Sequence, residues 1–220
     1  MSTILTVIEV IGVLSFSVSG ALMAIDKEND FIGVIFLALV TAFGGGILRD
    51  IMIGNHPPII FENFLLIAVS IITATAVFFL AMIFKKYYIE NEETVQKINN
   101  YIDALGLGVF VISGVKLCMA AQFHNPIFII LMGMISGTGG SMTRDIIMRE
   151  VPYLLRKRIY LLAAMAGATS YYLLFKLGMP DVAAVIISAS LVFFIRVCAT
   201  VFKWNMPKAI DFSKLRDDKQ

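Results

Sequence analysis

Charged residues are scarce in this sequence of 220 residues: Asp, Glu, Lys and Arg make up 15% of it, against about 25% in soluble domains. Hydrophobic residues make up 59%, and the mean hydropathy is +0.85. A chain of this length would fill one or two soluble domains, but so few charges could not cover their surface. The composition therefore excludes a soluble protein and predicts an integral membrane protein. The net charge of +2 gives no reason to expect a nucleic-acid partner.

Cysteine and histidine are also rare, and catalytic motifs are missing. Cys118 and Cys198 both lie inside apolar runs, which excludes a disulfide framework or a regularly spaced metal site and predicts buried free thiols. His56 and His124 are isolated in short loops. The sequence has no phosphate-binding loop, no serine nucleophile motif and no His-Glu-x-x-His zinc motif. We therefore expect no enzyme, no metal and no cofactor.

Long apolar runs are what the sequence has in abundance. A helix needs about 20 predominantly apolar residues to cross a bilayer, and seven segments qualify, at 4–25, 31–48, 63–84, 104–122, 125–143, 159–175 and 182–202. Their connections are short except for the polar stretch 85–100, which separates the third segment from the fourth. The sequence thus predicts an all-α protein with seven transmembrane helices.

The sequence also contains an internal repeat. The run Gly-Gly-Gly-Ile-Leu-Arg-Asp-Ile-Met at 44–52 matches Gly-Gly-Ser-Met-Thr-Arg-Asp-Ile-Ile at 139–147, an offset of 95 residues that Pro57 and Pro152 share. Five further pairs match at an offset of 94: Glu9 with Asp103, Gly12 with Gly106, Phe16 with Phe110, Ser19 with Ser113 and Gly20 with Gly114. Agreement at a fixed period indicates a duplicated unit.

Each copy of the repeat holds three segments, an odd number, so the second copy enters the membrane from the opposite side. The two copies are then related by a pseudo-two-fold axis in the membrane plane, as in many transporters. We expect the first repeat at 1–90, the inverted second repeat at 91–178, a seventh helix outside the repeat at 179–203 and a polar tail at 204–220.

Basic residues outside the apolar segments gather on one side of the predicted membrane. With seven spans, that side receives Lys27, Lys85, Lys86, Lys97, Arg149, Arg156, Lys157, Arg158, Lys203, Lys208, Lys214, Arg216 and Lys219. The opposite side receives Lys176 alone. Because cytoplasmic loops carry an excess of Lys and Arg, we expect a multi-pass protein of the inner membrane with its N-terminus outside and its C-terminus in the cytoplasm.

The glycine runs lie near the centre of their apolar segments. They comprise Gly44, Gly45 and Gly46 in the second segment and Gly137, Thr138, Gly139, Gly140 and Ser141 in the fifth. Glycine costs a helix about 1 kcal/mol relative to Ala, so we expect both helices to be kinked or broken there. Backbone groups freed at that depth must be buried or line a wet cavity, and paired broken helices are typical of a transport pathway. The alternative is that the glycines only allow close helix packing.

An Arg-Asp pair follows each glycine run by about one helical turn. Adjacent helical residues point about 100° apart, so we expect pairing across the pseudo-two-fold axis, of Arg49 with Asp145 and of Arg144 with Asp50. Ionisable groups inside spans are costly and are by default functional. These four residues would shape the electrostatics of a pore, or alternatively form structural ion pairs.

Lys116 lies in the middle of the fourth segment and breaks the repeat, since its counterpart is Leu22. A lysine at that depth should face a cavity or a carboxylate, and its charge would repel permeating cations, which suits a gate. The alternative is a structural pair with Glu9 or Asp103, or a side chain that reaches the membrane interface.

Acids and hydroxyls complete the candidate residues. Glu9 and Asp103 are equivalent acids that would attract cations or neutralise basic residues. Hydroxyls near the glycine runs come from Ser19, Ser113, Thr41, Thr138, Ser141 and Thr143. Hydroxyl and carbonyl oxygens suit monovalent cations, although helical hydroxyls often bond to their own backbone instead.

The doubled motif, from Gly44 to Asp50 and from Gly139 to Asp145, resembles the trimeric intracellular cation (TRIC) channel family in its prokaryotic form. The resemblance covers most of the chain and implies a homotrimer with one hourglass-shaped pore in each protomer. It implies potassium and sodium as the permeating ions, helices kinked at the glycines and a gating role for Lys116. The basic motif that binds phosphoinositide lipid in animal members is not found here, and the second copy reads Gly-Gly-Ser instead of Gly-Gly-Gly.

We therefore predict a monovalent cation channel that contacts membrane lipid and permeating ions. Bacterial relatives with the same repeat are regarded as carriers of small solutes, so the first alternative is a secondary transporter for a solute such as glycine. The second alternative is a structural or partner-binding membrane protein, against which the short loops argue.

Overall fold

The computed structural model describes residues 3–152, 155 and 159–204, and within them every regular element is a helix. Seven helices are long and apolar enough to cross a membrane: α1 (Thr3–Asp26), α2 (Phe31–Ile53), α3 (Phe64–Ile83), α5 (Glu92–Ala120), α6 (Pro126–Ile147), α8 (Ile159–Lys176) and α9 (Asp181–Val201). The short helices η1 (Ile59–Glu62) and α4 (Lys85–Glu90) lie in connections. The predicted fold class is confirmed.

The helix ends follow from local sequence. Asp30 accepts a hydrogen bond from the amide of Gly33 at the start of α2, and Asn125 caps α6, whose first residue is Pro126. Both are arrangements typical of helix N-termini. Gly54 ends α2 with a φ of 79°, a left-handed conformation that glycine adopts without strain.

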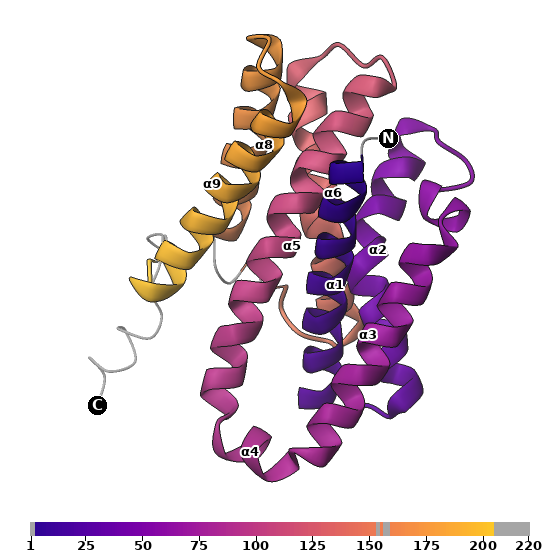
Figure 1. Cartoon of the computed structure of the whole chain (residues 1–220), viewed down its shortest axis with the longest axis vertical. Coiled ribbons are helices and arrows are strands. Elements are labelled where there is room, and N and C mark those ends of the chain that lie inside the picture. Colours follow the sequence, from indigo (N-terminus) through magenta and orange to yellow (C-terminus); the bar gives the residue numbers. More distant parts are fainter. Residues whose placement is uncertain (1–2, 153–154, 156–158, 205–220) are drawn as a thin grey trace, which may run out of the picture.

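The connection between the two halves is largely helical. The polar stretch 85–100 is helical, forming α4 and the first two turns of α5, so that α5 begins 12 residues before the predicted start of the fourth segment. Glu, Lys and Gln are good helix formers, and α5 extends through them beyond the apolar part of the chain. In Figure 1 this extension and α4 form the lower end of the molecule.

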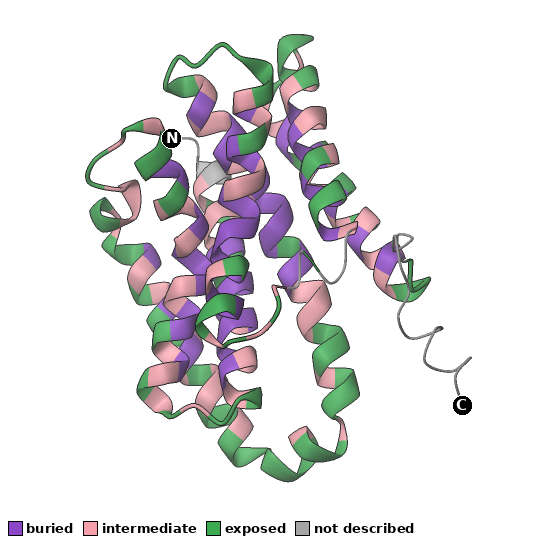
Figure 2. Ribbon diagram, turned by 180° about the vertical axis from the view of Figure 1, so that it is seen from behind, coloured by how far each residue is buried: buried purple, intermediate pink, exposed green. Residues whose placement is uncertain are grey.

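The two halves of the repeat pack against each other in the middle of the bundle. α1 contacts α5 and α2 contacts α6, while α9 lies against α8 and α5 on one flank (Figure 1). Figure 2 shows the buried residues concentrated in the centre of the bundle and exposed ones at the lower end. Large apolar side chains such as Phe64 and Ile72 remain exposed on the outer faces, where a lipid environment would solvate them.

The contacts between the halves repeat the inverted symmetry. An ideal Cβ placed on Gly45 of α2 would lie 2.1 Å from the carbonyl oxygen of Ser136 on α6, and one on Gly140 would lie 2.1 Å from that of Thr41. Gly45 and Gly140 are repeat equivalents, as are Thr41 and Ser136, so these are the same contact made once by each half. Most of the predicted polar tail, 205–220, and the basic residues 156–158 lie outside the described residues.

Candidate functional site

The glycine runs lie where α2 crosses α6, and neither helix is broken there. α2 is continuous from Phe31 to Ile53 and α6 from Pro126 to Ile147. A break is therefore wrong, and a kink at the glycines stays a prediction. A Cβ on Gly44 would lie 3.2 Å from the Cα of Gly140, and one on Gly139 would lie 3.0 Å from the Cα of Gly45. The helices keep their internal hydrogen bonds and gain a backbone-to-backbone contact, which favours the close-packing interpretation of these glycines.

Two other glycines of the runs differ in their surroundings. A Cβ on Gly137 would lie 2.4 Å from Cγ2 of Val111 on α5, so this glycine faces a third helix. A Cβ on Gly46 would meet only Nη2 of Arg49, at 3.6 Å. Gly46 lines a cavity instead. The first glycine run therefore has two roles: Gly44 and Gly45 allow the close helix contact, and Gly46 forms part of the cavity wall.

Most predicted hydroxyls are bound to their own helix. Thr41, Thr138 and Thr143 each donate to the carbonyl oxygen four residues earlier, over 2.6–2.8 Å. Ser141 donates to the carbonyl of Thr138 and also lies 3.2 Å from the hydroxyl of Tyr160 on α8. Own-backbone bonding is therefore the correct interpretation for these groups.

The Arg-Asp pairs form within each motif and not across the axis, so the predicted cross-pairing is wrong. Nη2 of Arg49 lies 2.8 Å from Oδ1 of Asp50, and Arg144 and Asp145 repeat this distance. The Nε atoms also donate to the same carboxylates, over 2.9 Å. The flexible arginine side chain bends toward the adjacent aspartate, and two guanidinium nitrogens, Nε and Nη2, bind its carboxylate. All four residues are at most 5% exposed.

Each arginine also reaches the other half of the molecule. Nη1 of Arg49 donates to the hydroxyl of Ser136 on α6 over 3.1 Å, and Nη1 of Arg144 donates to Ser19 on α1 over 3.0 Å. Asp50 accepts from the amide of Ile59 at 3.0 Å and so holds the connection after α2. Ser136 is not among the predicted hydroxyls, although the repeat carries a signal for it: its equivalent Thr41 is one of them.

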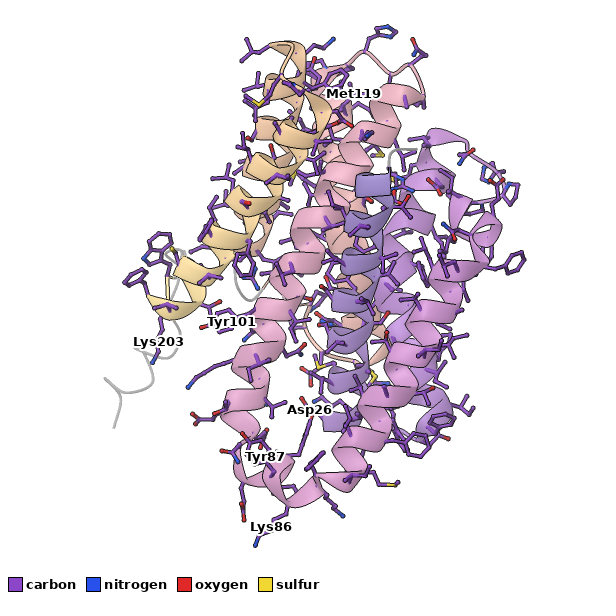
Figure 3. All side chains as sticks on the ribbon, viewed as in Figure 1. Asp26, Lys86, Tyr87, Tyr101, Met119 and Lys203 are labelled. Atoms are coloured by element: carbon purple, nitrogen blue, oxygen red, sulfur yellow. The ribbon has the colours of Figure 1, made fainter. Side chains whose placement is uncertain are left out.

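A lower cavity of about 370 Å³ opens next to Arg144. Ser19 accepts from Arg144 and donates to Oδ1 of Asp103 over 3.2 Å, forming a chain of polar groups across the cavity wall. The charged lining residues are Asp26, Lys27, Glu92, Asp103, Arg144 and Glu150. Four carboxylates thus face two cations, and Lys27 pairs with Glu150. Asp26 lies near the lower end of the molecule (Figure 3).

An upper cavity of about 140 Å³ is lined by the equivalent residues of the other half. Glu9, Arg49 and Ser113 line it, and their repeat equivalents Asp103, Arg144 and Ser19 line the lower cavity. The structure thus brings the predicted acids, the arginines and the three predicted serines, Ser141 in the lower cavity included, together in two sites at opposite ends. Among the described residues, no three His, Cys, Asp or Glu side chains are grouped as a metal site would require.

Lys116 pairs with a residue that the sequence analysis missed. Its Nζ lies 2.5 Å from Oδ2 of Asp181, the first residue of α9, and Tyr171 donates to Oδ1 of the same carboxylate over 2.7 Å. The predicted alternatives, pairing with Glu9 or Asp103, are not found. Asp181 lies one residue before the predicted apolar segment 182–202, so the sequence alone places it in a loop. A cavity of about 570 Å³ between α5, α6, α8 and α9 contains this pair.

Two further contacts connect the repeat to its surroundings. The guanidinium of Arg196 on α9 lies over the ring of Tyr160, 4.5 Å from its centroid. Near the lower end, Tyr88 donates to Oδ1 of Asp26 over 2.5 Å. Burial is the main cause that raises the pKa of Tyr88 above its usual value, and this hydrogen bond is the second cause. Tyr88 therefore keeps its proton and remains a donor.

Comparison with known proteins adds three kinds of similarity. The family model described as "Glycine transporter" matches residues 6–82 and 100–176. The UPF0126 membrane protein YvgT of Bacillus subtilis is 30% identical over 201 residues, which cover 91% of this chain and 94% of that protein. The TRIC channel orthologue from Rhodobacter sphaeroides has a TM-score of 0.82 at 30% identity, covering 92% of this chain and all of the other. A prokaryotic TRIC channel solved in 0.5 M KCl has a TM-score of 0.83 at 29% identity, covering 94% of this chain and all of the other.

Proposed function

Because the chain belongs to the family of the TRIC channels and the UPF0126 membrane proteins, we propose that it conducts potassium and sodium ions through a pathway within each protomer of a homotrimer. The solved structures that it resembles are channels and not enzymes. This similarity supports a cation channel. That the permeating ions are potassium and sodium, and that the protein is a trimer, are our proposal.

One observation carries the proposal: two cavities built from equivalent residues lie at opposite ends of the bundle. Each has an acid, a serine and a buried arginine, and the two face each other across the level at which α1 packs on α5 and α2 on α6. Residues of α1 and α5 line both cavities, whereas α2 lines only the upper one and α6 only the lower one. A pathway through this level would be wide at both ends and narrow in the middle.

The charges favour cations. Arg49 and Arg144 are each neutralised by the adjacent aspartate. Glu9 then sets the sign of the charge in the upper cavity, and Asp103 does so in the lower cavity together with Asp26 and Glu92. Clefts lined by one sign of charge concentrate counter-ions. Oxygen ligands from serines and carboxylates suit hard monovalent cations. The glycine crossing and the Arg-Asp pairs would hold the helices that surround the ions.

We also propose the orientation in the membrane. The lower end carries Lys27, Lys85, Lys86, Lys97 and Arg149, whereas Lys176 lies at the upper end, beside the connection to α9. The excess of positive charge on cytoplasmic loops then puts the lower end in the cytoplasm and the N-terminus outside the inner membrane. Membrane lipid would cover the exposed apolar faces.

A carrier for a small solute such as glycine is the second candidate. It is favoured by the description of the family model and by the separation of the two cavities, because alternating access also requires a site that opens to one side at a time. A zwitterion would find both an arginine and an acid in either cavity.

Single-channel recording of purified protein in a planar bilayer under a potassium gradient tests the proposal. Discrete current steps that reverse near the potassium potential are expected. A silent bilayer, with insertion of the protein demonstrated, combined with saturable glycine uptake by proteoliposomes, would instead establish the carrier. Light scattering of the purified protein in detergent checks the trimer, and a monomer would contradict that part.

A further inference from the structure

We propose that the stacked rings of Phe16 and Phe110 form an apolar gate between the two cavities. This inference rests on the proposed channel function and adds the residues that close the pathway. The two phenylalanines are equivalent positions of the repeat, one on α1 and one on α5. Their ring centroids are 5.1 Å apart and the ring planes differ by 16°.

The face of α1 shows where the gate lies. Glu9 and Val13 line the upper cavity, and Ser19 and Met23 line the lower one. Phe16 falls between them at the helical spacing of three to four residues, so it lies on the same face. It lines neither cavity and is 1% exposed. The two cavities therefore end on either side of this residue.

The face of α5 gives the same result in reverse order. Asn99 and Asp103 line the lower cavity, and Phe110, Ser113 and Leu117 line the upper one. Between Asp103 and Phe110 on this face comes Gly106, which has no side chain to occupy the space. The antiparallel helices α1 and α5 thus put an aromatic ring of one opposite a glycine of the other.

The rings fill the space that the glycines leave. A Cβ on Gly106 would lie 2.4 Å from Cδ1 of Phe16, and one on Gly12 would lie 3.2 Å from Cε2 of Phe110. Polar groups lie on both sides: the hydroxyl of Ser19 follows Phe16 by one turn, and that of Ser113 follows Phe110 by one turn. A hydrated ion therefore meets two hydrocarbon rings between two polar cavities, and apolar constrictions of this kind close a pore by excluding water.

The symmetry suggests how the gate opens. Because both rings lie on the same helix pair, a shift between α1 and α5 moves each ring away from its glycine and from its partner at once. No backbone hydrogen bond has to break. Opening then needs only that the stack separate far enough for water to connect Ser19 with Ser113.

The test is single-channel recording of Phe16→Ala, Phe110→Ala and the double variant, beside the wild type. The closed state loses a stacked pair, so the ratio of open to closed time should rise by up to about tenfold for each single variant. Phe193→Ala, which disrupts the Phe193–Phe194 pair on α9, is the matched control and should gate like the wild type. Elution volume and melting temperature report whether each variant is folded.

Truncation of a buried phenylalanine commonly destabilises a protein, so Phe110→Leu provides a second test. Leucine keeps an apolar side chain at this position but cannot stack, and an open-to-closed ratio between those of the wild type and Phe110→Ala is expected. A wild type that conducts, with folded Phe16 and Phe110 variants whose open probability is unchanged or lower, overturns the gate but leaves the channel. A wild type and variants that are all silent overturn the channel and the gate together.

Discussion

Arg144 on α6 donates to the hydroxyl of Ser19 on α1 over 3.0 Å, although 125 residues separate them in the sequence. The same guanidinium holds the carboxylate of Asp145 through two nitrogens. One buried side chain therefore neutralises its neighbour and joins the second half of the repeat to the first. Arg49 joins the two halves in the same sense at the other end, but through a position that is not the repeat equivalent of Ser19: it donates to Ser136 on α6.

Replacing Arg144 with alanine should strongly destabilise the protein. The substitution leaves Asp145 buried without its guanidinium, and loss of one partner of a buried ion pair costs about 3–5 kcal/mol. Unfolding of the purified protein in detergent by heat or denaturant measures the loss. The control is Lys86→Ala, which removes an exposed cation near Glu90 and should change stability little. A variant Arg144→Ala as stable as the wild type would contradict the account of the pair.

Two neighbouring glycines should respond to alanine in opposite ways. Gly45→Ala forces a methyl group against the backbone carbonyl of Ser136, which cannot rotate away, and should cost roughly 3 kcal/mol, the upper end of the range for overpacking. Gly46→Ala meets only an ordinary contact and should be neutral or stabilise α2 by up to about 1 kcal/mol. Melting temperatures of the two variants compare them directly. Equal losses would show that the close crossing of α2 and α6 is not what requires Gly45.

The pair of Lys116 and Asp181 should stabilise the closed state by joining α5 to the start of α9. Lys116→Ala and Asp181→Asn should therefore both raise the open probability in bilayer recordings, and the exchanged variant, with Lys116→Asp and Asp181→Lys, should restore it. Lys176→Ala is the control for loss of a positive charge in the same cavity. If Lys116→Ala alone changes gating, the charge of Lys116 acts without Asp181.

The acids of the two cavities should determine selectivity for cations. Glu9→Gln and Asp103→Asn should each lower the ratio of potassium to chloride permeability by roughly tenfold, the low end of what a charged cleft gives. Reversal potentials in a potassium chloride gradient measure the ratio. Glu62→Gln, at an exposed position of η1, provides the control, since its charge lies in a connection. Unchanged reversal potentials for both cavity variants would exclude this role.

Much of the fold follows from the sequence because apolar length and repetition are strong signals. Seven spans and the inverted repeat need only the apolar runs and the matched positions, such as Glu9 with Asp103. The apolar segment that begins at 104 does not show where α5 begins, because Glu92 and Gln96 continue the helix beyond the apolar part of the chain.

The site is less accessible from the sequence. The residue types of the cavities are correct, since the repeat itself singles out Arg49, Arg144, Glu9 and Asp103. Their partners depend on side-chain geometry, which the sequence does not contain. The long side chain of Arg49 or Arg144 bends toward the adjacent aspartate, although the Cβ atoms of the two residues point in different directions. Helix propensity predicts a kink or break at the glycine runs because it does not include the contact between α2 and α6, across which both helices remain continuous.

The contact between Gly45 and Gly139 also bears on the speed of any opening. At that level the two helices touch through their main chains, so no side-chain rotation can widen the space, and only a displacement of whole helices can. Such displacements take microseconds to milliseconds, whereas rotamer changes of exposed side chains take picoseconds to nanoseconds. The stacked rings of Phe16 and Phe110 also separate by a helix shift, so both boundaries of the pathway would move on the slower time scale, and openings would come as bursts without a separate fast flicker.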